Sequence, residues 1–295
     1  MTSSNHSPSV EAFFDKDTGT FSYVVYDHAD GSAAIIDPVL DYDPVSARTS
    51  TASAERMLAF VHANRLSVEW ILETHAHADH LSSGGYLRDQ FGAKLAIGSG
   101  IIDVQARFKT LFGLDDAFVA DGRQFDRLFD DGDSFLIGQC EARVLATPGH
   151  TNDGLTYVIG DAAFIGDTMF APEIGTARCD FPGGDAARLY GSIRSILALP
   201  AATRLFLCHD YPPATRGPIA QSSVEAQTQD NIHIGHGATE DAFIAIRTAR
   251  DATLPVPRLL LPALQVNIRG GRLPDADAEG IAYLKLPLNQ LGGKP

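Results

Sequence analysis

The sequence predicts an α/β (α+β) protein built as a four-layer αββα sandwich. Two observations favour this fold: strand and helix signals alternate through the first third of the chain, and short strands recur from Ala142 onward with an amphipathic helix behind them. No linker separates the two parts, and 295 residues of which 44% are hydrophobic can bury a full core. We therefore expect a single domain over 1–295, with two pseudo-symmetric halves at roughly 10–140 and 141–265 and a C-terminal tail.

The first half opens on a predicted hairpin made of residues 20–26 and 33–36, which Asp37 and a proline end. A helix follows, because apolar residues recur from Ala54 at helical spacing and Ser53 is an expected N-cap. The remaining elements are a buried strand at 68–72, a helix at 84–91, a strand at 94–97 and a helix at 101–112.

The second half begins after the acidic turn at 130–133, which lacks the alternating ligands of a calcium loop. A helix with Asp185 as its expected N-cap presents Leu189 and Ile193 to the core. Strands are predicted at 134–137, 142–146, 155–159, 162–165, 205–208 and late at 281–284, and further helices at 224–232 and 239–252.

Charge and composition exclude several classes of function. The net charge of −14 gives an acidic surface, which disfavours binding to nucleic acid or to anionic membrane lipid. The N-terminus lacks the apolar core of a signal peptide, and no apolar run approaches the ~20 residues that cross a bilayer. Three cysteines without CxxC spacing fit a reducing compartment, and strand alternation predicts that Cys208 packs in the core. We expect a cytoplasmic protein.

A metal-binding motif follows the strand at 68–72. His75, His77 and His80 stand with Asp79 within six consecutive positions, and the first two imidazoles, two apart, can share one cation. Neutral imidazole and carboxylate suit zinc, iron or manganese.

Three more candidate ligands follow predicted strands further along the chain. His150 lies in Thr-Pro-Gly-His-Thr, Asp167 in Gly-Asp-Thr, and His209 directly before Asp-Tyr. Each alone is more often a structural polar residue at a strand end. Together they predict one metal centre assembled from both halves.

This order of ligands resembles the metallo-β-lactamase superfamily over nearly the whole chain. The resemblance implies that His75, His77 and His150 form one metal site and that Asp79, His80 and His209 form another, with Asp167 bridging. Hydrolases and oxygenases of the superfamily share these ligands, so they do not decide the reaction.

A second resemblance concerns the reaction. The run Gly175-Thr-Ala-Arg-Cys-Asp-Phe181 and the later Leu-Tyr-Gly-Ser at 189–192 are similar to the GxGRxDF and LYxS segments of persulfide dioxygenases (sulfur dioxygenases), with Ala177 and Cys179 as departures. His-Asp-Tyr at 209–211 and Leu-Pro-Val-Pro at 254–257 also fit that family, whereas the tail at 266–269 resembles a bacterial branch called β-lactamase-like hydrolases.

The persulfide dioxygenase resemblance implies one Fe(II) per chain, held by His75, His150 and Asp167, with glutathione persulfide and O₂ as substrates. His77, Asp79, His80 and His209 would then orient ligands and water around it. Dimerisation fits the family, but no segment identifies an interface.

Two substrate contacts are expected, each beside a structural alternative. Arg178 would pair with a glutathione carboxylate, or equally with Asp180. Tyr211 would donate its hydroxyl to the substrate, or pack in the core beside His209. Arg247 adds charge near the mouth or sits on a solvated face.

Two other functions compete with the dioxygenase. In a dinuclear zinc hydrolase of glyoxalase II (hydroxyacylglutathione hydrolase) or lactonase type, two zinc ions per chain would use all seven ligands. A non-catalytic scaffold is disfavoured because a chain without catalysis would be free to lose one of the seven.

Overall fold

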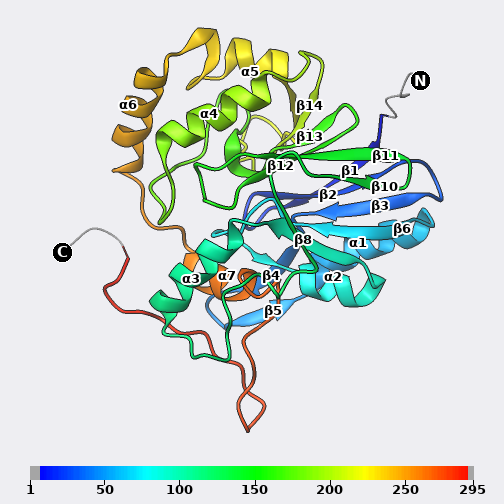
Figure 1. Ribbon diagram of the computed structural model, residues 1–295, viewed down its shortest axis with the longest axis vertical. Coiled ribbons are helices and arrows are strands. Elements are labelled where there is room, and N and C mark those ends of the chain that lie inside the picture. Colours follow the sequence, from blue (N-terminus) through cyan, green and yellow to red (C-terminus); the bar gives the residue numbers. More distant parts are fainter. Residues whose placement is uncertain (1–6, 292–295) are drawn as a thin grey trace.

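The computed structural model describes residues 7–291 and confirms the four-layer αββα sandwich (Figure 1). Two six-stranded sheets face each other, with α1, α2, α3 and α7 outside the first and α4, α5 and α6 outside the second. The first sheet runs in the order β1 (Ser9–Asp15), β2 (Thr20–Tyr26), β3 (Ser32–Ile36), β6 (Ser67–Leu72), β8 (Lys94–Gly98), β9 (Arg127–Phe129). The second runs β10 (Ser134–Ile137), β11 (Cys140–Ala146), β12 (Leu155–Ile159), β13 (Ala162–Phe164), β14 (Arg204–Phe206), β15 (Gln221–Ser223).

The helices cover the outer faces of these sheets. They are α1 (Ala52–Ala63), α2 (Gly84–Phe91), α3 (Ile101–Phe112), α4 (Ala186–Leu197), α5 (Val224–Asp230), α6 (Glu240–Asp251) and α7 (Leu260–Asn267), with 3-10 turns η1 (Gly166–Thr168) and η2 (Gly235–Gly237). A small third sheet pairs β4 (Val39–Asp43) with β5 (Arg48–Ser50) and β7 (Leu81–Ser82). No helix among residues 7–291 is long and apolar enough to span a membrane.

The core lies in three layers of apolar side chains. Between the sheets, aromatic residues from both halves interlock, and the Tyr23 ring meets Phe164 and Phe206 at centroid distances of 5.3 and 5.4 Å. Outer layers join the first sheet to α1, α2, α3 and α7, and the second sheet to α4 and α6. Burial of this apolar surface is the main favourable term in folding, at about 25 cal/mol per Å².

Most predicted elements are confirmed within a residue or two. The hairpin pairs Tyr26 with Ala33, and the Asp185 side chain caps α4 by accepting from the Arg188 N–H at 2.8 Å. The prediction that Ser53 is the N-cap of α1 is wrong. Thr51 is the N-cap residue, and the Ser53 hydroxyl donates to Asp41 at 2.7 Å.

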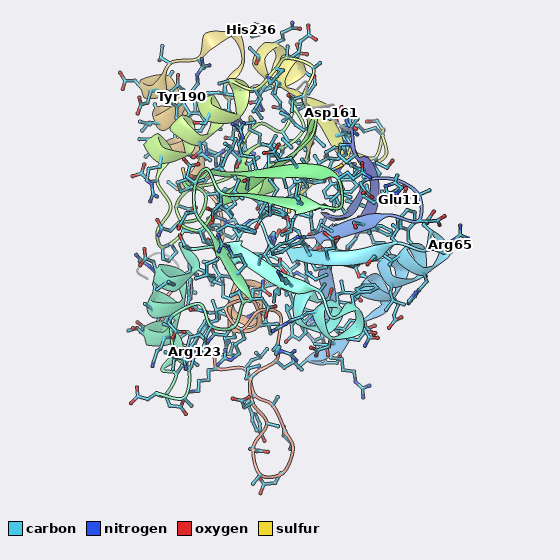
Figure 2. The ribbon with its side chains drawn as sticks, turned by 45° about the vertical axis from the view of Figure 1, so that its right-hand side comes forward. Glu11, Arg65, Arg123, Asp161, Tyr190 and His236 are labelled. Carbon is cyan, nitrogen blue, oxygen red and sulfur yellow. The ribbon has the colours of Figure 1, made fainter. Side chains whose placement is uncertain are left out.

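The late strand at 281–284 is also wrong, because these residues form no ladder with any strand of the described chain, although Leu284 packs near Leu40 and Leu81. The sequence missed β1, an edge strand on which Glu11 projects outward, a charge that opposes pairing with another chain (Figure 2). It also missed α7. The cytoplasmic location and the bounds of the two halves stay predictions.

Candidate metal centre

The loop that carries the first imidazoles begins where two strands end side by side. β3 and β6 pair in parallel, so Asp37 after β3 and Thr74 after β6 reach the same edge of the first sheet. The Asp37 carboxylate accepts from the Thr74 N–H at 2.7 Å and from its hydroxyl at 2.9 Å. His77 Nε2 lies 3.0 Å from Asp37 Oδ1, a contact in which the ring nitrogen donates. Asp37 therefore fixes both the loop and one imidazole.

Three of the predicted ligands form a first group: His75, His150 and Asp167. Their ligand atoms lie within 4.8 Å of one another, and all three side chains are buried. Asp167 Oδ2 lies 4.0 Å from His75 Nε2 and 3.5 Å from His150 Nε2. His150 Nδ1 donates to the Arg178 carbonyl at 2.7 Å, which leaves Nε2 of that ring as the ligand atom. Two imidazoles and one carboxylate thus converge from three different loops.

The other four predicted ligands form a second group: His77, Asp79, His80 and His209, again with ligand atoms within 4.8 Å of one another. The superfamily resemblance places His77 with His75 and His150, and the His77 ring lies between the two groups, with its centroid 4.0 Å from that of His75 and 4.1 Å from that of His80. His209 Nε2 lies 2.8 Å from Asp79 Oδ2 and 3.2 Å from Asp167 Oδ1. Asp167 therefore borders both groups.

Unpartnered buried atoms show that these residues fit a metal ion. His75 Nε2, His80 Nε2 and His77 Nδ1 are buried without a hydrogen bond, whereas His209 Nε2 and Asp167 Oδ1 face each other at 3.2 Å. Burying polar atoms without partners costs about 1–3 kcal/mol each. A cation shared between the lone pairs of these atoms would remove this cost.

Electrostatics differ between His75 and His77. Burial first, and then the charge of His77, hold the pKa of His75 well below its ordinary value, so this imidazole is neutral and able to bind a metal. His77 is different: burial opposes its charged form, but the Asp37 carboxylate outweighs burial and raises the pKa of His77 well above its ordinary value. Beside it, burial raises the pKa of Glu73 to about 8.

The sequence does not identify one side chain that holds the loop at 75–80 in place through hydrogen bonds. Asn267, in α7, is buried and donates to the carbonyls of His77 and His80 at 2.8 and 2.9 Å. Its Oδ1 accepts from the Ser82 N–H at 2.8 Å. Asn267 therefore ties the C-terminal segment to the metal loop, and no strand-end signal in the sequence marks it.

Cys208 is buried, as predicted, but its neighbours are polar. Its Sγ lies 3.8 Å from Asp37 Oδ2 and within 4.8 Å of a ligand atom of His209, which strand alternation predicts on the opposite side. The reason is that β14 ends at Phe206, so strand alternation does not extend to residues 207–209.

A cavity of about 260 Å³ opens onto the candidate metal centre. Asp79, His150 and Asp167 line its base, and Phe170, Ile174, Phe181 and Leu254 make its walls apolar. Such a wall excludes water and strengthens electrostatic interactions at the base. Arg178, Arg247, Arg250 and Tyr211 also line it, so the cavity presents cations around an apolar throat.

Arg178, Tyr211 and Arg247 all line this cavity, but they differ in their burial and in the partners that they already have. Arg178 pairs with Asp180 through two hydrogen bonds of 2.6 and 2.7 Å, which is the structural alternative, and its contact with a substrate stays a prediction. Tyr211 is 54% exposed and stacks on His209, so core packing is wrong for it. Arg247 is buried and donates to the Thr176 carbonyl at 3.0 Å, which contradicts a solvated position.

Fold and site together define a class: metal-binding proteins in which loops at one edge of an αββα sandwich carry histidines and carboxylates. The chain belongs to the metallo-β-lactamase superfamily, whose family model matches residues 15–209. Members of this superfamily are enzymes.

Individual relatives differ in the activity that their names give. A probable metallo-hydrolase of Burkholderia pseudomallei is 52% identical over 96% of this chain and 99% of its own. A β-lactamase hydrolase-like protein of Agrobacterium fabrum is 53% identical, and the match spans 97% of this chain but 66% of that longer protein. The human mitochondrial persulfide dioxygenase ETHE1 is 30% identical over 85% of this chain and 84% of its own. The crystal structure of ETHE1 from Myxococcus xanthus has a TM-score of 0.71 at 29% identity and covers 90% of this chain and 100% of that one.

Asp153 provides a test of how the two halves hold the first group. Its Oδ2 accepts from the Ala76 N–H at 2.7 Å, between His75 and His77, and the Leu155 N–H donates to the Thr74 carbonyl at 2.8 Å. We expect Asp153→Ala to weaken metal binding by about 10-fold to 100-fold, the effect typical of lost outer contacts, measured by chelator competition. Asp153→Asn keeps an acceptor oxygen and should restore most of the affinity; equal affinities for Asp153→Ala and the unsubstituted protein would exclude this role.

Proposed function

We propose that this chain is an Fe(II)-dependent persulfide dioxygenase that oxidises glutathione persulfide with O₂ to sulfite and glutathione. The observation that carries the proposal is the first group, in which two imidazoles and one carboxylate converge. A set of two histidines and one carboxylate with open positions is typical of non-haem iron oxygenases. The similarity to the human persulfide dioxygenase and the Arg178–Phe181 segment support the same reaction.

The reaction balances with water as the second co-substrate: one persulfide, one O₂ and one water give one thiol, one sulfite and two protons. Bound iron would supply open positions for sulfur and O₂ and the means to pass electrons between them. The protein's own residues would do the rest. Asp79, which lines the cavity, would hold the water, and His209, 2.8 Å from the Asp79 carboxylate, would position it. Phe170 and Phe181 would keep bulk water out.

The thiol carrier would lie along the cavity mouth. Tyr211, half exposed beside His209, would donate its hydroxyl to the substrate, and Arg250 would attract a glutathione carboxylate, since it makes no ion pair among the described residues. Arg178 would reach the same carboxylate after releasing Asp180.

Oxygen uptake tests this activity directly. Protein loaded with Fe(II) should consume O₂ when glutathione persulfide is added and release sulfite in equal amount. Tyr211→Phe, which keeps the stacked ring and removes the hydroxyl, should raise KM more than it lowers kcat. Metal-dependent cleavage of glutathione thioesters without O₂ uptake would instead identify a hydrolase.

The second group favours one alternative, a dinuclear zinc hydrolase of glyoxalase II or lactonase type. Its four ligand atoms lie within 4.8 Å, and Asp167 borders both groups, as a bridging carboxylate would. The Burkholderia relative is also named a metallo-hydrolase. In that case two zinc ions per chain would be needed for activity.

A further inference from the structure

One peptide unit in the wall of the cavity contacts a candidate metal ligand at one end and a buried carboxylate at the other. The carbonyl of Arg178 accepts from His150 Nδ1 at 2.7 Å. The N–H of the same peptide unit belongs to Cys179 and donates to Asp251 Oδ2 at 2.9 Å. Because the C=O and N–H of a trans peptide point in opposite directions, these two hydrogen bonds join Asp251 to His150 through a single amide group.

Asp251 is held in place at the end of α6. Its side chain is buried, and its Oδ1 accepts from Arg247, one helical turn earlier, so Oδ2 remains for Cys179. Arg247 is buried too and donates to the Thr176 carbonyl at 3.0 Å. The Cys179 thiol lies 3.4 Å from the same Oδ2, and burial first, and then the Asp251 charge, raise the pKa of this thiol to about 12. The thiol therefore keeps its proton, and α6 holds the segment at 176–179 through a buried ion pair.

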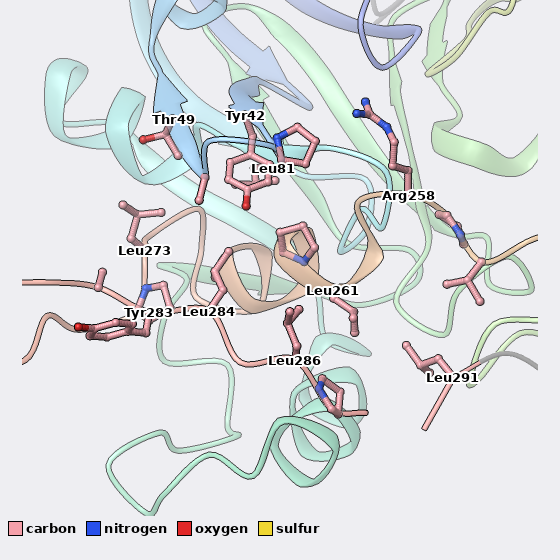
Figure 3. Close-up of a pocket in the computed structure, with 18 of the residues that line it drawn as sticks. Tyr42, Thr49, Leu81, Arg258, Leu261, Leu273, Tyr283, Leu284, Leu286 and Leu291 are labelled. Carbon is pink, nitrogen blue, oxygen red and sulfur yellow. The ribbon is translucent and has the colours of Figure 1, made fainter. Parts of the chain in front are cut away.

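Asp251 is the carboxylate that meets this peptide unit among residues 7–291. Asp180, which follows Cys179, is engaged by the Arg178 guanidinium through hydrogen bonds of 2.6 and 2.7 Å. Pro257 lines the cavity over the metal centre and also a second one, of about 700 Å³, beside the C-terminal segment (Figure 3). Apolar residues line most of that second cavity, and none of its described lining residues is acidic. This side of the protein therefore supplies no second carboxylate for the Cys179 N–H.

A charged acceptor at one end of a peptide unit strengthens the hydrogen bond at the other end. A hydrogen bond to an ionised group is about twice as strong as a neutral one, and hydrogen bonds in a chain polarise one another. The Asp251 carboxylate therefore makes the Arg178 carbonyl a better acceptor for the Nδ1–H of His150. That bond fixes the tautomer and the orientation of the ring, which leaves His150 Nε2 facing Asp167 Oδ2 at 3.5 Å.

The imidazoles of the first half of the fold are supported by a carboxylate in a comparable way. Asp37 Oδ1 lies 3.0 Å from His77 Nε2. Asp37 also accepts from the Thr74 hydroxyl at 2.9 Å, and this hydroxyl lies 3.1 Å from His75 Nδ1. His150 comes from the second half, and its Nδ1 meets a carbonyl, so a peptide unit connects this imidazole to its carboxylate.

We propose that Asp251 is a positioning residue for His150 and acts through the peptide unit between Arg178 and Cys179. α6 supplies none of the seven candidate ligands, yet through Asp251 it sets how strongly one of them binds metal. The proposal rests on His150 as a metal ligand and not on the reaction, because His150 has that role both in the iron dioxygenase and in the zinc hydrolase.

Asp251→Asn tests the role of the charge, because it keeps an acceptor oxygen near Cys179 and removes the carboxylate. Zn(II) affinity, measured by chelator competition, should fall about tenfold, the lower end of the effect typical of lost outer contacts. In Zn(II)-loaded protein labelled with ¹⁵N-histidine, the NMR signal of the His150 Nδ1 proton, assigned through its contact with the Phe181 ring, should move upfield and exchange faster with solvent. Neither measurement requires turnover, so both keep their meaning if the dioxygenase activity is absent.

Two further variants separate this role from a loss of folding. Asp251→Asn leaves the buried Arg247 without its counter-charge, so the paired variant Arg247→Met with Asp251→Asn, which removes both charges, is measured beside it. His233→Ala is the matched control, because His233 Nδ1 accepts from the Thr176 N–H at 3.0 Å in the same segment, but that peptide unit touches no candidate ligand. This control should be less stable to denaturant and should keep both the Zn(II) affinity and the His150 signal.

Three results would overturn the proposal. The first is an unchanged Zn(II) affinity in the folded paired variant. The second is weaker binding without any change in the His150 signal. The third is a loss of affinity in His233→Ala as large as in Asp251→Asn, since any loosening of the segment would then have the same effect.

Discussion

His75→Ala is expected to remove iron and dioxygenase activity together. His75 supplies one of the three converging ligands, its Nε2 has no hydrogen bond in the protein, and its neutral imidazole is held in place by the Thr74 hydroxyl 3.1 Å from Nδ1. Loss of one ligand of three leaves too few protein groups to hold the ion. The iron content measured by metal analysis should fall from about one ion per chain to nearly none, and sulfite formation should be lost in parallel.

The contrasting substitution is His209→Ala. His209 belongs to the second group and lies 3.2 Å from Asp167 Oδ1, so its removal should keep most of the iron while slowing turnover. His62→Ala, at an exposed histidine of α1, controls for loss of an imidazole and should change neither quantity. Equal metal loss from His75→Ala and His209→Ala would point to two ions that depend on each other.

Asn267→Ala is expected to destabilise the protein and loosen the metal loop. The substitution leaves the carbonyls of His77 and His80 and the Ser82 N–H buried without partners. At about 1–3 kcal/mol for each unsatisfied group, the free energy of unfolding should fall by roughly 3 kcal/mol or more. Denaturant unfolding of the metal-free protein measures the change, and chelator competition should show weaker iron binding.

Gln290→Ala provides the control for this second prediction, because Gln290 is an exposed amide near the C-terminus that donates to the Leu288 carbonyl at 3.2 Å. It should leave both unfolding and metal binding unchanged. If Asn267→Ala behaved in the same way, the three hydrogen bonds would not hold the loop.

The fold and seven candidate ligands could be predicted because both follow local rules. Apolar periodicity sets strands and helices, and ligands placed after strands meet at one edge of the sandwich. The same rule could also predict that Asp37 lies at the metal centre, because it directly follows the strand at 33–36, but the sequence places it only at the end of a hairpin. Asn267 could not be predicted, because its partners lie 185 to 190 positions away and nothing local marks the contact.

The C-terminal segment shows where alternating apolar residues predict a strand that does not form. Residues 281–284 alternate like a strand, yet in the described chain no strand pairs with them and Tyr283 is 59% exposed. Alternation predicts a half-buried surface, but the sequence does not state whether its own chain or another molecule covers it. Cys208 is buried as predicted, but it lies beside His209 rather than opposite it, because β14 ends at Phe206 and alternation does not hold beyond that residue.

Metal analysis of the full chain, isolated from cells grown without added metal, tests the central claim most directly. A site in which His75, His150 and Asp167 hold one ion predicts close to one iron per chain and little zinc, with O₂ uptake on glutathione persulfide proportional to iron content. Close to two zinc ions per chain, with thioester cleavage and no O₂ uptake, would contradict it.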